Sequence, residues 1–193
     1  MKRRDKALIF DYFGVLSSEV APFWLERYFD RETAVELKAR VVARADRGEL
    51  TEEGMFRELS ALSGEPAPAI LEDWLALAVP ERRFPPLLRE LGERCTVALL
   101  SNAPGTYLRR LLERDGYLGC FDAMRISSEE GITKPDPEIY LRLLGDLGLR
   151  GEDCLFIDDN PANLRGGEAA GIPGVLYSGD FETLKEMLLR WAE

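Results

Sequence analysis

The chain has 193 residues, 46% apolar and 31% charged, a balance typical of a soluble globular protein with enough apolar material for a core. It contains no histidine, which excludes Ser-His-Asp and Cys-His catalysis and zinc sites built on imidazole. With 35 acidic against 25 basic residues, the formal net charge is −10. Because no basic block could follow a phosphate backbone, we predict no nucleic-acid partner.

The start of the chain, residues 1–6, is mostly basic, like the first part of a signal peptide. The apolar run that follows it ends at Phe10, directly before Asp11, and no other apolar run is long enough to cross a bilayer. We therefore predict no signal peptide, no membrane association and a cytoplasmic location. The cysteines are odd in number and widely spaced, which favours buried free thiols over disulfides. They are Cys95, Cys120 and Cys154.

Five short apolar runs predict β-strands. They cover residues 7–10, 96–100, 123–126, 154–157 and 174–177. Nearly all of them lack strict alternation, which is typical of strands covered on both faces in a parallel sheet. Segments with helical spacing separate the later runs. This alternation predicts an α/β fold with a Rossmann-like, doubly wound, parallel five-stranded sheet.

The segment between the first two strands interrupts the alternation and predicts an all-helical insertion. Its four expected helices cover residues 20–29, 32–45, 52–62 and 69–77. Thr51 is placed to cap the third of these helices, and the glycine and proline cluster at 64–68 is placed to end it. We therefore predict an α/β core domain of residues 1–16 and 85–193 and a helical domain of residues 17–84. Further along the chain, we expect residues 127–131 to form a solvated loop.

Reactive side chains follow four of the predicted strands. In chain order they are Asp11, then Ser101 and Asn102, then Lys134 and Asp136, then Asp158 and Asp159. Each alone fits a helix cap, a turn or a surface charge. Together they would lie at the carboxyl edge of the sheet, where open α/β folds bind ligands. Carboxylates gathered there repel one another and favour a bound cation, for which Mg²⁺ is the usual choice in phosphate chemistry.

This set of residues fits phosphoryl transfer from a small phosphorylated substrate. Asp11 would attack phosphorus and form an aspartyl-phosphate, and the cation would bridge Asp11 and the phosphate. Lys134 and Ser101 would hold the remaining phosphate oxygens, and water would then release phosphate.

Four segments resemble, in order, the sequence signatures of the haloacid dehalogenase superfamily. They are LIFDYFGVL at 8–16, LSN at 100–102, TKPDPEIY at 133–140 and FIDDNPAN at 156–163. The resemblance covers nearly the whole chain and implies a hydrolase with a type 1 helical cap. It is nearest to the subgroup of α-D-glucose-1-phosphate phosphatase and the amino-terminal domain of epoxide hydrolases.

The resemblance also implies roles for individual residues. Asp11 would be the nucleophile and a metal ligand, together with Asp159 and the backbone carbonyl of Phe13. Asp158 would act on the water shell of the metal or on Lys134.

Further roles follow for residues around this centre. Arg47, in a cap turn, would be a candidate substrate contact, with a solvated surface arginine as the alternative. Asn102, Asp136 and Asn163 would fix the loops or orient the residues that touch the substrate.

One residue departs from the superfamily pattern. Most of its phosphatases have a second Asp two residues after the nucleophile, which protonates the leaving oxygen and later activates water, whereas this chain has Phe13. A phenyl ring can do neither. The substrate would then have a leaving group that needs little protonation, such as an anomeric or aryl phosphate. Otherwise another group supplies the proton, with Asp46, Glu49, Tyr12 and water as candidates.

Three functions remain open from the sequence. The first is a Mg²⁺-dependent phosphatase. The second is a metal-independent 2-haloacid dehalogenase, which resembles this motif because it also has an aromatic residue at this position. Against it, dehalogenases replace the acidic pair at 158–159 with hydroxyls. The third is a phosphate-sensing or binding module with little turnover. The sequence leaves the oligomeric state open.

Overall fold

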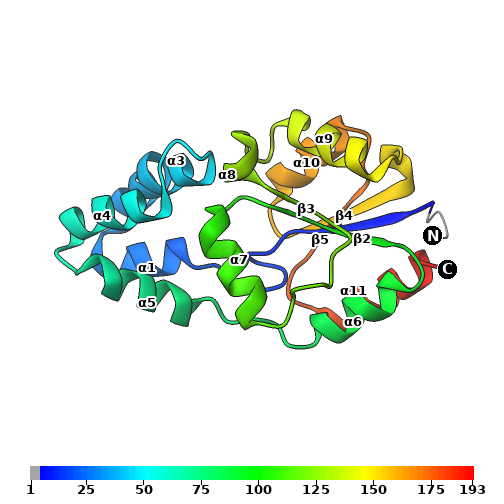
Figure 1. The fold of residues 1–193 in the computed structure, drawn as a ribbon, viewed down its shortest axis with the longest axis horizontal. Helices are drawn as coiled ribbons and strands as arrows, with labels where there is room; N and C mark the ends of the chain where they lie inside the picture. Colours follow the sequence, from blue (N-terminus) through cyan, green and yellow to red (C-terminus); the bar gives the residue numbers. More distant parts are fainter. Residues whose placement is uncertain (1–4) are drawn as a thin grey trace.

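The computed structural model describes residues 5–193 and contains a parallel five-stranded sheet in the order β3-β2-β1-β4-β5 (Figure 1). The strands are β1 (Ala7–Phe10), β2 (Thr96–Ser101), β3 (Ala123–Ile126), β4 (Cys154–Asp158) and β5 (Gly174–Leu176). The predicted Rossmann-like α/β fold and all five strands are therefore confirmed. Residues 1–4 of the basic start lie outside the described residues.

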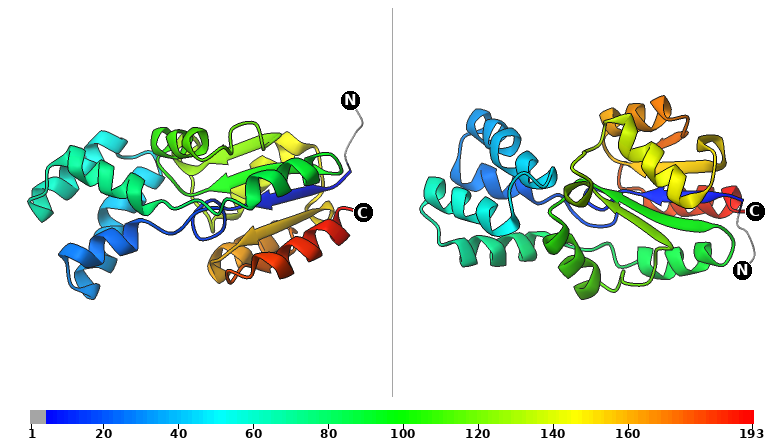
Figure 2. Two further views of the ribbon diagram at one scale, coloured as in Figure 1. Left: turned by 90° about the horizontal axis from the view of Figure 1, so that it is seen from below. Right: turned by 45° about the horizontal axis from the view of Figure 1, so that its top comes forward.

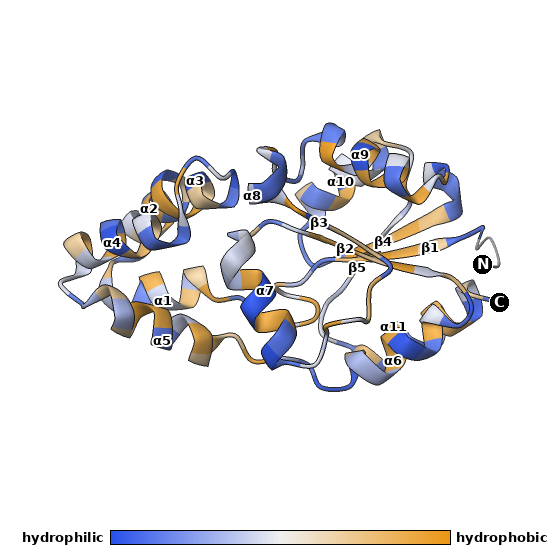
Figure 3. Ribbon diagram, in the orientation of Figure 1, coloured by the Kyte–Doolittle hydropathy of each residue, from blue (hydrophilic) through white to orange (hydrophobic). Residues whose placement is uncertain are grey.

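Both faces of the sheet are covered, which explains the continuous apolar runs. Along β1, Leu8 and Phe10 belong to one apolar cluster, and Ala7 and Ile9 belong to the other. The helices α6 (Phe84–Gly92) and α11 (Phe181–Trp191) cover the first face, and α9 (Pro137–Leu147) and α10 (Pro161–Ala169) cover the second. Hydropathy colouring shows apolar central strands under helices of mixed character (Figure 3). The edge strand β5 is partly exposed, because it has a neighbouring strand on one side only.

The segment between β1 and β2 folds into a lobe of helices beyond one end of the sheet (Figures 1 and 2). It contains α1 (Ala21–Tyr28), α2 (Arg31–Leu37), a π-helical turn (Lys38–Val42), α3 (Ala43–Asp46), α4 (Glu52–Ser63) and α5 (Ala67–Leu77). Thr51 caps α4 by accepting a hydrogen bond from the Gly54 amide, and Gly64 ends it in the left-handed conformation. The helix predicted at 32–45 is present as a helical segment over residues 31–46, and the π-helical turn within it was not predicted.

The two connections between this lobe and the α/β core run side by side. The Ser18 amide donates to the Val79 carbonyl at 3.0 Å, and the Val79 amide donates to Ser18 Oγ at 2.9 Å. One apolar cluster continues from the sheet into the lobe, where Trp74 of α5 packs edge-on against Tyr107 of α7 (Gly105–Arg114). The helical lobe, called the cap below, is therefore packed against the core.

One helix was not predicted, and one predicted loop is wrong. The helix α6 has no counterpart in the sequence prediction, because prolines at its start obscured its apolar spacing. Residues 127–131 are not a solvated loop, since α8 (Ser127–Glu130) forms there and Ser127 is fully buried. A short 3-10 helix (Gly151–Asp153) precedes β4.

The three cysteines are buried free thiols, as predicted. No helix within residues 5–193 has the length and apolar character needed to span a bilayer.

Candidate active site

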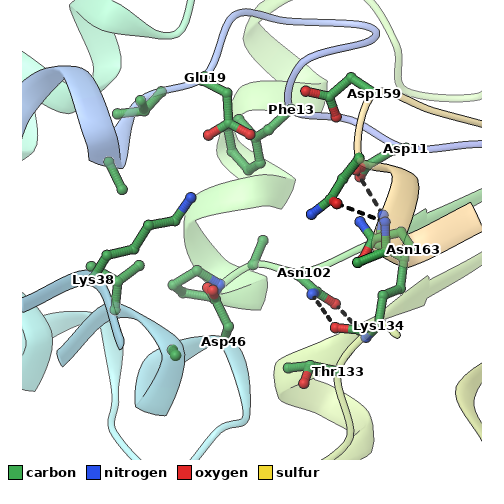
Figure 4. A pocket seen from close by; sticks show the side chains of 18 of the residues that line it. Asp11, Phe13, Glu19, Lys38, Asp46, Asn102, Thr133, Lys134, Asp159 and Asn163 are labelled. Carbon is green, nitrogen blue, oxygen red and sulfur yellow. Dashed lines mark hydrogen bonds and ion pairs between the residues drawn. The ribbon is translucent and has the colours of Figure 1, made fainter. Parts of the chain in front are cut away.

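A cavity of about 320 Å³ lies between the carboxyl ends of the central strands and the cap (Figure 4). Charged and amide side chains reach it from both sides. The core contributes Asp11, Asn102, Lys134, Asp159 and Asn163, and the cap contributes Lys38 and Asp46. Glu19 lines the cavity from the connection that leads into the cap.

Lys134 joins two of the predicted carboxylates. Its ammonium nitrogen lies 2.7 Å from Asp11 Oδ2 and 2.7 Å from Asp158 Oδ2, and its side chain is fully buried. Burial alone would lower the pKa of Lys134, but the charges of Asp11 and Asp158 outweigh that effect and raise it. The ammonium therefore stays charged and holds the two carboxylates together.

Asp11 directly follows β1 and is 6% exposed. Burial raises the pKa of its carboxyl well above the ordinary value, against the attraction of Lys134 and with a further increase from Asp158. The Tyr12 amide donates to Asp11 Oδ1 at 2.6 Å. This contact and the ion pair with Lys134 fix the direction of the carboxylate.

Asp158 is completely buried and its oxygens are occupied by protein donors. Besides Lys134, the Asn160 amide donates to Oδ1 at 2.8 Å, and Asn163 Nδ2 lies 3.0 Å from the same oxygen. The Tyr140 hydroxyl in turn donates to the Asn163 carbonyl at 2.6 Å. The contact with Lys134 is one of the two roles expected for Asp158.

The three acidic residues fit a divalent cation. Oxygen atoms of Asp11, Asp158 and Asp159 all lie within 4.8 Å of one another. Burial raises the pKa of Asp159, and the nearby charges of Glu19 and Asp158 raise it further. A cation would offset this repulsion, and the all-oxygen donor set suits Mg²⁺.

A glycine makes room for Asp159. Gly14 has a φ of +81°, and a Cβ built there would lie 2.2 Å from Asp159 Oδ2. The absence of a side chain at residue 14 thus lets the loop after β1 approach the loop after β4.

Three other predicted site residues in the core have different surroundings. Asn102 binds the backbone of Lys134 through both side-chain atoms, at 2.9 Å and 2.8 Å. Ser101 is fully buried at the end of β2, and its hydroxyl has no hydrogen-bond partner among the described residues. Asp136 caps α9 by accepting from the Glu138 amide.

Arg47 does not line the cavity among the described residues. Its Nε lies 2.7 Å from Glu49 Oε1, and both side chains are partly exposed. The cap turn reaches the cavity through Asp46 instead, as Figure 4 shows.

The sequence did not point to several side chains that line the cavity. Lys38 and Glu19 line the cavity although neither lies in a recognisable motif. An aromatic wall was also missed. It consists of Phe13, Tyr107 and Trp74, with the Phe13 and Tyr107 rings stacked at 6.3 Å and the Trp74 and Tyr107 rings edge-on at 5.9 Å. Of these three residues, only Phe13 lies in a motif that pointed to the site.

Comparisons with known proteins agree with this fold. Residues 6–171 match the sequence model of the haloacid dehalogenase-like hydrolases. The sesquiterpene phosphatase astK of Aspergillus oryzae is 26% identical over 94% of this chain and 94% of its own. A phosphoserine phosphatase of Thermus thermophilus is 33% identical over 64% of this chain and 53% of its own.

Solved structures share the fold. A HAD family enzyme of Bacteroides thetaiotaomicron superposes with a TM-score of 0.79 at 21% identity, over 93% of this chain and 97% of the other. A complex of that enzyme with magnesium and inorganic phosphate gives a TM-score of 0.74 at 22% identity, over 93% and 98%. A 2-haloacid dehalogenase of Pseudomonas syringae gives a TM-score of 0.67 at 19% identity, over 96% and 99%.

Proposed function

Since the chain belongs to the haloacid dehalogenase-like hydrolases, we propose that it is a Mg²⁺-dependent phosphatase that hydrolyses a small phosphomonoester. One observation carries the proposal. Three carboxylates from two strand ends have oxygens within 4.8 Å of one another beside a buried ammonium. Such a site can hold a cation and a phosphate together, and the relatives named as phosphatases support this choice within the family.

Each residue has a defined task in this proposal. Asp11 attacks phosphorus with a carboxylate oxygen, and the bond to the leaving oxygen breaks. Lys134 and the unpartnered Ser101 hydroxyl hold phosphate oxygens. When bound between Asp11, Asp159 and the Phe13 carbonyl, Mg²⁺ supplies positive charge that offsets the charge of the transferring group. Water then attacks the aspartyl-phosphate and frees Asp11.

The cavity indicates the kind of organic group that the phosphate carries. Its aromatic wall runs from Phe13 and Tyr107 of the core to Trp74 of the cap, where the part of the substrate beyond the phosphate would reach. A sugar, aryl or other ring can pack against such a wall. We therefore include sugar phosphates and apolar phosphomonoesters in the proposed substrate class.

A 2-haloacid dehalogenase is the second candidate, because the aromatic Phe13 follows the nucleophile and dehalogenases share the fold. The acidic pair opposes it. Asp158 and Asp159 stand beside Asp11, and carboxylates repel the carboxylate that a haloacid substrate carries.

The test measures p-nitrophenyl phosphate hydrolysis with and without Mg²⁺. We expect activity that requires Mg²⁺ and falls at least about 10³-fold in Asp11→Asn. Asp146→Asn is the control, because Asp146 is an exposed carboxylate of α9 that pairs with Arg125. Metal-independent chloride release from 2-chloropropionate would instead show a dehalogenase. Binding of tetrafluoroberyllate without either reaction would show a phosphate-binding module.

A further inference from the structure

The proposed reaction leaves one proton without a source. An alcohol leaves phosphorus readily only if its oxygen is protonated as the bond breaks. Phe13 has no proton to give, and Tyr12, a candidate from the sequence, is fully buried with its hydroxyl directed to Asp115. The Tyr107 hydroxyl donates to the Trp74 carbonyl at 2.8 Å. For a substrate whose leaving group needs a proton, we therefore look for another acidic side chain in the cavity.

Three charged side chains among the described residues that line the cavity remain outside the proposed phosphate and metal centre: Glu19, Lys38 and Asp46. Among them, Asp46 has a backbone anchored to the core. The Ser127 hydroxyl donates to the Asp46 carbonyl at 2.5 Å, and Ser127 Oγ accepts from the Ala103 amide at 3.0 Å. Ala103 directly follows Asn102, so these bonds connect Asp46 to the loop that holds Lys134.

A glycine brings this cap turn onto the core. Gly48 has a φ of +71°, and a Cβ built there would lie 2.3 Å from the Ser128 carbonyl oxygen. Only a glycine permits so close an approach in this conformation. The turn after α3 therefore packs against α8, and the Asp46 side chain lies at the cavity (Figure 4).

The Asp46 carboxyl is free to exchange a proton. No described residue makes a hydrogen bond to its side chain. Burial raises the pKa of Asp46 to about 7, Lys38 and Arg47 act against this shift, and Glu19 adds to it. Across the cavity lie the charged groups of Asp11, Lys134 and Asp159. Near neutral pH the carboxyl is thus present in both protonation states, as a general acid and base requires.

We propose that Asp46, from the cap, is the general acid and base of the reaction and replaces the carboxyl that position 13 lacks. This inference rests on the proposed phosphatase function. In the first step, Asp11 bonds to phosphorus, the electron pair of the breaking P–O bond passes to the leaving oxygen, and that oxygen takes the Asp46 proton. In the second step, Asp46 takes a proton from water, whose oxygen attacks phosphorus and releases phosphate and the Asp11 carboxylate.

Two substrates of similar shape test this role. p-Nitrophenyl phosphate releases an acidic phenol that needs no proton, and p-nitrobenzyl phosphate releases an alcohol that does. We expect Asp46→Asn to lower kcat/KM about 100-fold for the benzyl ester and only a few-fold for the phenyl ester. The ratio kcat/KM reports the steps up to the first irreversible one, so the later base step does not mask the difference.

The pH profile gives a second readout. In the unaltered protein, kcat/KM for the benzyl ester should fall as the pH rises through 7, because the carboxylate form of Asp46 has no proton to give. This fall should be absent in Asp46→Asn. Glu49→Gln is the matched control, since Glu49 lies in the same turn, pairs with Arg47 and does not line the cavity.

Each other outcome overturns the inference in a recognisable way. Equal losses on both esters would make Asp46 a positioning or binding residue. A selective loss in Glu19→Gln instead would assign the proton to Glu19. If the unaltered protein hydrolyses neither ester with Mg²⁺, the proposed phosphatase function itself fails.

Discussion

The two walls of the cavity differ in how firmly their charged side chains are held. On the core wall, Asp11, Lys134 and Asp158 are almost completely buried and paired with one another. On the cap wall, no described residue makes a hydrogen bond or ion pair with the side chain of Lys38 or Asp46. These three core side chains are thus held in place before substrate arrives, whereas the cap wall has charges still to be paired.

This difference separates two tasks. A phosphoryl group is the same in every substrate, so the side chains that bind it can be fixed in advance. The rest of the substrate varies, and groups on the cap are free to pair with it. We therefore expect core substitutions to abolish the reaction and cap substitutions to change its substrate or pH dependence.

The largest effect should come from breaking the core wall with Lys134→Met. This change leaves two buried carboxylates without their ammonium and removes a ligand for phosphate. We expect kcat/KM for p-nitrophenyl phosphate to fall at least about 10²-fold, and the protein to lose about 3 kcal/mol of stability without metal. Urea unfolding measures the second quantity, and Lys185→Met on α11 is the control. An unchanged stability would mean that the two carboxylates are not charged in the fold.

The core wall is also the part that the sequence predicted well. Asp11, Ser101 and Asp158 lie at or directly after the ends of apolar runs, and parallel strands bring such ends to one edge of the sheet. Lys134 lies further from the end of its strand, and its position at the site was predicted from the TKPDPEIY motif at 133–140. The hydrogen bonds between the Asn102 side chain and the Lys134 backbone could not be predicted, because they join two loops that are far apart in the sequence.

The cap wall was predicted less completely, for a physical reason. The periodicity of residues 32–45 correctly indicated helix, but the π-helical turn at Lys38–Val42 adds a residue to one turn and changes which side chains face the cavity. Lys38 and Val42 line the cavity from that turn. A sequence gives little sign of such a turn, since its stability comes from packing within the cap and not from local propensity.

A smaller effect is expected for Asp46→Asn on the cap wall, in the pH dependence of the free energy of unfolding. In the fold, burial raises the pKa of Asp46 to about 7, so the folded protein binds this proton more tightly than the unfolded chain does. Stability therefore falls as the pH rises from about 4 to about 7, and Asp46→Asn, which has no such proton, should escape this loss. We expect the variant to be about 1 kcal/mol more stable at pH 8, with no gain near pH 4, after allowing for partial exposure.

Urea unfolding at both pH values measures this difference, with Asp146→Asn as the exposed control. A variant that is no more stable at pH 8 would show that the Asp46 carboxyl is already ionised in the fold at neutral pH. The cap wall would then have no proton to offer.

The smallest effect should come from Arg47→Ala. This variant tests whether the cap turn contributes to catalysis through the Arg47 charge or through its backbone contacts with α8. The Arg47 guanidinium is bound to Glu49 at the surface, and the backbone contacts of Asp46 and Gly48 with α8 do not involve it. An exposed ion pair of this kind contributes at most about 1 kcal/mol. We therefore expect less than about a twofold change in kcat/KM for either nitrophenyl or nitrobenzyl phosphate. A tenfold rise in KM would show that Arg47 turns into the cavity and binds substrate when the substrate is present, as the family resemblance implies. It would also mean that Arg47 on the cap, unlike the charged side chains of the core wall, reaches its functional position only when substrate is bound.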